Sequence, residues 1–89
     1  MDARQRVALN LRRIRVMRGI SQDNLALEAN VERAYVGYLE RGNKNPTVTT
    51  LEKIAEALAC DISEFFVPVA EETAEIKPLK SGRKSTRNK

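Results

Sequence analysis

Residues 21–42 read SQDNLALEANVERAYVGYLERG, and this stretch decides the fold. Ala26, Asn30 and Val36 stand four and then six residues apart, a spacing typical of a helix-turn-helix. Ala26 is small enough to let a second helix pass close by. Asn30 stands where the first helix must end in a left-handed conformation, which Asn adopts more readily than most residues other than Gly. Val36 is then expected to fill the inner face of the second helix.

A helix is predicted over about residues 3–18, before the motif. Asp2 can cap it, and Gln5 occupies the position that completes a reciprocal capping box. Gly19 should end this helix, and Ser21 is placed to cap the next one. The residues expected to face the core in these two helices are Val7, Leu11, Ile14, Leu25, Ala26 and Ala29.

The second half of the motif is predicted to be a helix over about 32–41. Glu32 is an unusual N-cap, although its charge suits the positive end of the helix dipole. Val36 and Leu39 should face inward, and Gly42 should close the helix. Gly37 lies inside it and should lower helix stability by on the order of 1 kcal/mol relative to Ala.

Two further helices are expected before the apolar pattern stops at Pro68. The first begins at Thr47 or Thr49, and Thr49 with Glu52 forms a T-x-x-E capping box. Its apolar stripe is Leu51, Ile54, Ala55 and Leu58. Asp61 is placed to cap a last short helix. The sequence shows no strand signal, so we predict an all-α domain.

Charge is unevenly distributed along the chain. The net charge is +4, but residues 77–89 carry six basic residues and no acid. Residues 68–76 carry three acids, and residues 1–67 hold ten basic and nine acidic residues. We therefore expect a domain over 1–67 and a flexible, acidic-then-basic, disordered tail over 68–89. The overall charge is poor support for nucleic-acid binding by the domain itself.

The composition argues against several functional classes. The chain has no His and one Cys, which excludes a disulfide framework and a Cys/His zinc site and removes the commonest general base. No nucleophile–base pair or phosphate-binding loop is visible, so no enzyme activity, cofactor, metal or small-molecule ligand is expected. Cys60 is expected to be a small buried residue. No apolar run could span a membrane and the N-terminus is not a signal peptide, which indicates a cytoplasmic protein.

The motifs resemble those of a known family. They are Leu11-Arg12-Arg13-Ile14-Arg15, Gly19-Ile20-Ser21-Gln22, Leu25-Ala26, Tyr35-Val36, Leu39-Glu40-Arg41-Gly42, Asn45-Pro46 and Leu51-Glu52-Lys53-Ile54-Ala55-Glu56-Ala57-Leu58. Residues 7–67 resemble the phage repressor and Cro type of helix-turn-helix domain, also called the xenobiotic response element family. This implies a five-helix repressor-like bundle in a prokaryotic, nucleoid-associated DNA-binding regulator. Residues 30–36 are similar to the controller proteins of restriction-modification systems, but Asn30, Glu32 and Gly37 depart from the family pattern.

The resemblance also implies contacts to the DNA backbone. Gln22 opens the first helix of the motif, and the matching Gln of the family donates to a phosphate. The loop after residue 42 adds three more candidates: Asn43, Lys44 and Asn45. Each of these could instead be an ordinary solvated side chain. Arg15 and Glu40 are implied to form a partly buried ion pair that fixes geometry and does not touch DNA.

Helical position selects the residues that could read bases. Arg33 lies in the first turn of helix 32–41, and its fork can bond both acceptors of a guanine edge. Its alternative is a solvated Arg or a partner of Glu32. Ala34 could touch a thymine methyl group or leave room for the base. Tyr38 should face outward, whereas Tyr35 could either pack against the preceding helix or touch DNA.

The last apolar cluster suggests self-association, and its candidate interface residues are Ile62, Phe65, Phe66 and Val67. They could equally complete the core. The favoured function is a sequence-specific transcriptional regulator that binds double-stranded DNA as a homodimer at a pseudo-palindromic operator. The alternative is a protein-interaction module such as the antitoxin half of a toxin–antitoxin pair. In that case the apolar end or the tail would be the working surface.

Overall fold

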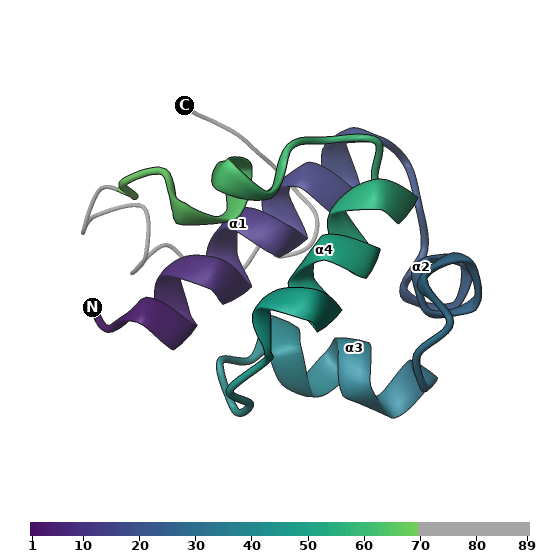
Figure 1. The fold of residues 1–89 in the computed structure, drawn as a ribbon, viewed down its shortest axis with the longest axis horizontal. Helices are drawn as coiled ribbons and strands as arrows, with labels where there is room; N and C mark the ends of the chain where they lie inside the picture. The colour runs from purple at the N-terminus through teal and green to yellow at the C-terminus, as the bar shows by residue number, and fades with distance from the viewer. Residues whose placement is uncertain (70–89) are drawn as a thin grey trace.

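The computed structural model describes residues 1–69 as a bundle of helices, with no strand in that range. Four α-helices, α1 (Ala3–Met17), α2 (Gln22–Ala29), α3 (Arg33–Glu40) and α4 (Val48–Ala57), are followed by a 3-10 helix, η1 (Ile62–Phe66). In Figure 1, α3 runs along the lower edge of the molecule and η1 lies across α1 at the opposite side. From residue 70 onward, the predicted tail lies outside the described residues.

The predicted helix ends at the start of the chain are confirmed. The Asp2 carboxylate accepts from the backbone N–H of Gln5, and the Gln5 side chain accepts from the backbone N–H of Asp2. The hydrogen bond to the Gln5 N–H lowers the pKa of Asp2, as expected for a carboxylate that caps a helix. Ser21 caps α2 by accepting from the N–H of Asn24 at 3.0 Å. Gly19 takes a φ of +70° immediately after the helix, where an L side chain would be strained.

The core lies between α1, α2, α3 and α4 and is apolar. Its buried members are Val7, Ala8, Leu11, Ile14, Leu25, Ala26, Ala29, Val36, Leu39, Leu51, Ile54, Ala55, Leu58 and Phe65. The inward positions predicted from helical spacing are all among them. Val36 and Leu39 of α3 are in the core, whereas Arg33, Ala34 and Tyr38 of the same helix are exposed to solvent.

One predicted feature of the second half is wrong, and another is confirmed only in part. The helix cap after Pro46 is Thr47, whose hydroxyl accepts from the N–H of Thr50 at 3.0 Å, so the Thr49–Glu52 capping box does not form. Thr49 lies one residue too far along, inside α4. The predicted last helix is present as a short 3-10 helix. It ends before Val67, which is extended because it precedes Pro68.

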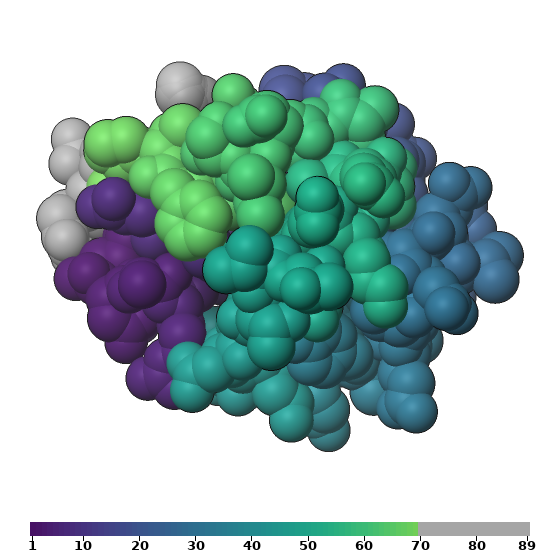
Figure 2. Space-filling view, viewed as in Figure 1, coloured from purple at the N-terminus to yellow at the C-terminus, as the bar shows by residue number. Residues whose placement is uncertain are grey.

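One buried polar side chain joins the two ends of the domain. Asn10 on α1 is 1% exposed, and its amide donates to the carbonyl oxygens of Phe65 and Val67, each at 3.0 Å. These carbonyls belong to η1 and to the residue that follows it, and they would otherwise be unsatisfied at a helix end. Figure 2 shows the segment after α4 packed against α1 and α4 on this face.

Candidate nucleic-acid interface

The turn between α2 and α3 has the geometry of a helix-turn-helix. Asn30 adopts the left-handed conformation, with φ 60° and ψ 47°, as its sequence position predicts. The N–H of Val31 then donates to the carbonyl of Ala26 at 3.0 Å, which closes the end of α2. Glu32 precedes α3 as its N-cap but makes no side-chain capping hydrogen bond. The turn therefore sends α3 across α2 with Ala26 buried between them.

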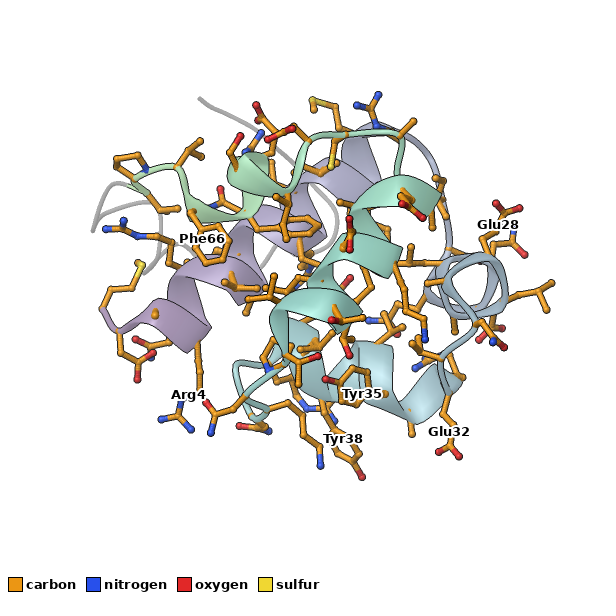
Figure 3. The ribbon with its side chains drawn as sticks, viewed as in Figure 1. Arg4, Glu28, Glu32, Tyr35, Tyr38 and Phe66 are labelled. Atoms are coloured by element: carbon orange, nitrogen blue, oxygen red, sulfur yellow. The ribbon has the colours of Figure 1, made fainter. Side chains whose placement is uncertain are left out.

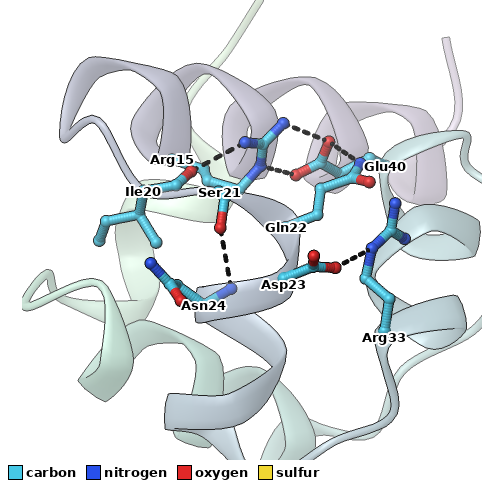
Figure 4. Close-up of polar contacts among 8 residues, drawn as sticks. All are labelled: Arg15, Ile20, Ser21, Gln22, Asp23, Asn24, Arg33 and Glu40. Atoms are coloured by element: carbon cyan, nitrogen blue, oxygen red, sulfur yellow. Dashed lines mark hydrogen bonds and ion pairs between the residues drawn. The ribbon is translucent and has the colours of Figure 1, made fainter.

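Behind this turn lies a network of four partly buried residues, Arg15, Ile20, Gln22 and Glu40 (Figure 4). Arg15 makes a forked contact with Glu40, Nε to Oε2 and Nη2 to Oε1, the latter at 3.0 Å. Its remaining Nη1 donates to the carbonyl of Ile20 at 2.9 Å. The side chains of Arg15 and Glu40 are 13% and 4% exposed. The pair implied by the sequence thus joins α1 to the last turn of α3.

Gln22 belongs to the same network. Its Nε2 donates to Oε1 of Glu40 at 2.9 Å, so the amide connects the first turn of α2 to α3. Sequence reasoning assigned Gln22 to the DNA backbone and did not anticipate this bond. One N–H of the amide remains for a phosphate, so the backbone contact stays a prediction.

Arg33 opens α3 and forms an ion pair with a residue that the sequence patterns did not indicate. Its Nε lies 2.6 Å from Oδ1 of Asp23 on α2, and the side chains are 53% and 79% exposed. Figure 4 shows the two groups side by side at the edge of the motif. The alternative partner Glu32 is next to Arg33 in sequence, and its side chain extends into the solvent (Figure 3). Base contact by Arg33 stays a prediction, with its guanidinium at the surface.

The two tyrosines of α3 have different environments. Tyr35 is half-buried and packs against the core, and burial raises the pKa of its phenol. Tyr38 is 42% exposed and points outward from the lower edge in Figure 3. The guanidinium of Arg41 and the ammonium of Lys44 lie 5.1 Å and 5.3 Å from its ring centroid. Cations at this distance over a ring are attracted by its negative face.

The loop after α3 presents the predicted phosphate contacts to solvent. Asn43, Lys44 and Asn45 are exposed, and the N–H of Asn43 donates to the carbonyl of Tyr38 at 3.0 Å. Gly42 precedes them with a φ of +75° and lies against Gln5 of α1. The loop is therefore positioned beside the exposed end of α3.

A helix-turn-helix family model, HTH_3, matches residues 11–65, which is more than half of the chain. The chain belongs to the HTH_3 family. Members of this family carry a helix-turn-helix DNA-binding domain and act in transcription, so this HTH_3 protein is a transcriptional regulator. The predicted resemblance to repressor-type regulators is confirmed.

Relatives of this HTH_3 protein include small regulators. It is 37% identical over 71 residues to the HTH-type transcriptional regulator y4dJ of Sinorhizobium fredii, covering 80% of this chain and 92% of the relative. It is 38% identical over 66 residues to the control protein C.SmaI of Serratia marcescens, covering 74% and 79% of the two chains. The crystal structure of the restriction-modification controller protein C.AhdI of Aeromonas hydrophila superposes with a TM-score of 0.69 at 35% identity, covering 71% and 96%.

Arg41 is a candidate interface residue that sequence reasoning missed. It is the C-cap of α3, it is exposed, and it shares the outward face with Tyr38. Its spacing of eight residues from Arg33 and four from Gly37 was a signal that could have found it. A Cβ placed on Gly37 would lie 3.3 Å from Nη1 of Arg33 and 3.4 Å from Nη1 of Arg41. Gly37 thus leaves room for two arginine side chains.

The candidates for self-association divide by burial. Phe65 is fully buried in the core, which corrects its assignment to an interface, because it has no surface left for a partner. Ile62 and Val67 are half-buried, and Phe66 is 44% exposed. Figure 3 places Phe66 beside α1, far from Tyr38.

The remaining functional classes find no further support in the described part of the chain. Within residues 1–69, no cluster of three or more His, Cys, Asp or Glu side chains could hold a metal ion. None of the described helices has the length and apolar character needed to cross a membrane. Cys60 is half-buried beside the core, and burial raises the pKa of its thiol, which favours the less reactive protonated form.

Proposed function

We propose that this HTH_3 protein regulates transcription by binding a pseudo-palindromic operator as a homodimer, with α3 of each subunit in a major groove. The observation that carries the proposal is the division of α3 into two faces. Val36 and Leu39 are buried, whereas Arg33, Ala34 and Tyr38 are exposed on the opposite side. A recognition helix needs this arrangement, because its outward side chains must reach base edges while its inner face fixes its position.

The proposed base contacts follow from the chemistry of this face. The Arg33 guanidinium can donate two hydrogen bonds to the O6 and N7 acceptors of guanine. Ala34 has a methyl group that suits a thymine methyl, and the Tyr38 hydroxyl can donate to an acceptor in the groove. The half-buried position of Tyr35 makes it a packing residue whose hydroxyl could reach the DNA at the edge.

Backbone contacts are proposed on both sides of α3. Gln22 at the first turn of α2 and the exposed loop Asn43, Lys44 and Asn45 flank the helix. Cations and amides at such positions bind phosphates and set the register of a protein on the duplex. Arg41, whose guanidinium lies over Tyr38, extends this flank.

The proposed dimer places two α3 helices about 34 Å apart, the distance between successive major grooves on one face of DNA. The seam is assigned to the surface around η1, with Phe66 as the exposed apolar side chain and Ile62 and Val67 at its edge. This surface is formed where η1 lies across α1 and does not include α3 (Figure 1), so the dimer would leave the outward face of each α3 exposed. Occupancy would then follow protein concentration through dimer assembly, which suits autoregulation.

Selection of bound duplexes from a random pool, followed by sizing of the complex in solution, tests this proposal. The expected result is an inverted repeat bound by two chains. Phe66→Ser should then give a monomer that binds one half-site weakly. A co-purifying protein together with no selected duplex would instead support the protein-interaction module, and an asymmetric site bound by one chain would refute the dimer.

A further inference from the structure

We infer that Asp23 positions the guanidinium of Arg33 for base reading and so determines specificity, an inference that rests on the proposed function. Asp23 is the second residue of α2, and Arg33 is the first residue of α3. The pair therefore crosses the turn of the helix-turn-helix and connects the supporting helix to the proposed reading helix. No role in reading DNA would be assigned to Asp23 from its charge, because DNA repels carboxylates.

The contact uses one edge of the guanidinium and leaves the other free. Nε of Arg33 lies 2.6 Å from Oδ1 of Asp23. An arginine carries five N–H donors in a rigid plane, and four of them belong to Nη1 and Nη2. A guanine edge requires two donors side by side. The ion pair therefore holds the guanidinium beside Asp23 through its Nε side and leaves the terminal nitrogens available to guanine.

Gly37 bounds the guanidinium on its other side. Nη1 of Arg33 lies over Gly37, where a Cβ would stand only 3.3 Å away, tighter than most Cβ contacts. One end of the guanidinium is thus paired with the Asp23 carboxylate, and Nη1 occupies the space that a side chain at position 37 would need. Gly37 departs from good helix-forming sequence, and this close approach gives a physical reason for its presence.

Stability does not account for this arrangement. More than half of each side chain in the pair is exposed, and surface ion pairs of this kind contribute little to folding. A negative charge beside the phosphates should weaken overall DNA binding. Fixing the direction of Arg33 before binding is the advantage that a positioning carboxylate provides, because less side-chain freedom is then lost in the complex.

Asp23→Asn tests the inference on the selected operator. We measure binding to the operator and to a scrambled duplex, and take the ratio of the two dissociation constants as specificity. This ratio is expected to fall roughly fivefold to tenfold, part of the discrimination that a bidentate Arg–guanine contact provides. The loss of discrimination should be concentrated at one base pair of the operator. This is the base pair at which Arg33→Ala no longer distinguishes the correct base from the others. Thermal unfolding measures any change in α2, where Asp23 also lies near the helix N-terminus.

Glu32→Gln is the matched control. Glu32 is exposed at the N-terminus of α3, and among the described residues its side chain makes no hydrogen bond or ion pair. The substitution likewise removes one negative charge near Arg33, but it leaves the Asp23–Arg33 ion pair in place. It should tighten binding to operator and scrambled duplex alike and leave their ratio unchanged. When Arg33 has already been replaced by Ala, Asp23→Asn should likewise tighten binding to both duplexes and leave the ratio of their dissociation constants unchanged.

A second readout does not depend on DNA. The Nε–H resonance of Arg33 in the free protein should shift in Asp23→Asn and stay in place in Glu32→Gln. Three results would each overturn the role of Asp23. The Arg33 resonance could stay in place in Asp23→Asn, or the specificity ratio could stay unchanged. Asp23→Asn could also lower that ratio equally when Arg33 has already been replaced by Ala. If no duplex is selected at all, the proposed function fails and this inference fails with it. A selected duplex read by Arg33 but insensitive to Asp23 overturns this inference alone.

Discussion

Two arginine–carboxylate contacts stabilise different properties of the same motif. The buried network holds Arg15 and Glu40 away from water, and the guanidinium also donates to a backbone carbonyl while the carboxylate also accepts from Gln22. The exposed pair, Asp23 and Arg33, has a single contact at the surface. The residue types are nearly the same, but the surroundings differ.

This difference determines which equilibrium each contact controls. A buried charge that loses its partner must remain unsolvated in the folded state, so the loss falls on folding. An exposed charge that loses its partner is rehydrated, so the free energy of unfolding changes little. The missing contact can then affect only DNA binding, in which DNA replaces the water around the charge. Burial therefore separates the part of the motif that maintains its shape from the part that is available to bind.

The largest expected effect comes from Glu40→Ala, which would break the buried network. It leaves Arg15 buried without its carboxylate and should lower the free energy of unfolding by about 3 kcal/mol. Denaturant unfolding measures this loss. Glu52→Ala removes an exposed acid on α4 and should change stability by less than about 0.5 kcal/mol. Replacing both Arg15 and Glu40 by Met should recover much of the loss, and equal losses in the single and double variants would contradict this account.

Arg33→Ala tests the exposed side of the comparison. Operator affinity should fall by about 1–3 kcal/mol and discrimination at one base pair should relax, because the bidentate hydrogen bonds to guanine can no longer form. The free energy of unfolding should stay almost unchanged. Titration with the operator and with single-base variants measures the effect. An equal loss on operator and scrambled duplex would exclude base reading by Arg33.

Gly37→Ala should move folding and binding in opposite directions. Alanine favours the helix by up to about 1 kcal/mol, and the flexible ends of Arg33 and Arg41 can shift a few tenths of an ångström to admit the methyl group. Thermal unfolding should therefore occur at a higher temperature. Specificity for the operator should fall as Arg33 is displaced. If the same substitution lowers specificity equally in Arg33→Ala, another part of α3 is responsible.

The smallest expected effect is that of Lys44→Ala. A bond to a phosphate carries no sequence information, so operator and scrambled duplex should be weakened alike. The slope of log affinity against log salt should decrease in magnitude by about 0.9, the value for a single phosphate that is no longer neutralised. Binding measured across a salt series gives this slope. A change confined to the operator would indicate that Lys44 acts through Tyr38, whose ring it overlies.

Local signals in the sequence predicted most of the fold correctly. Asp2, Ser21 and Asn30 act on backbone groups within a few residues of themselves, so their roles could be read from spacing alone. Thr47 and Thr49, at the start of α4, gave competing signals. Both fit a capping pattern, and the correct choice of Thr47 depends on where Pro46 and the apolar stripe place the helix.

Interactions between helices were harder to predict. The hydrogen bond from Gln22 to Glu40 and the ion pair of Arg33 with Asp23 depend on how α2 and α3 cross, which no short sequence pattern contains. The family resemblance predicted the pairing of Arg15 with Glu40 but not the hydrogen bond from Gln22 to Glu40. The burial of Phe65 and the exposure of Phe66 likewise depend on the path of one 3-10 turn against α1.

The two hydrogen bonds of Asn10 have a consequence for the order of folding. The bond to Phe65 joins residues 55 positions apart, whereas the caps of α1 and α2 close over three. Bringing such distant segments together costs more chain entropy than forming a helical turn, so local structure is favoured first. We therefore expect docking of the last turn onto α1 to be a late step in folding. Amide protons of this turn should exchange with solvent before those of the central helices.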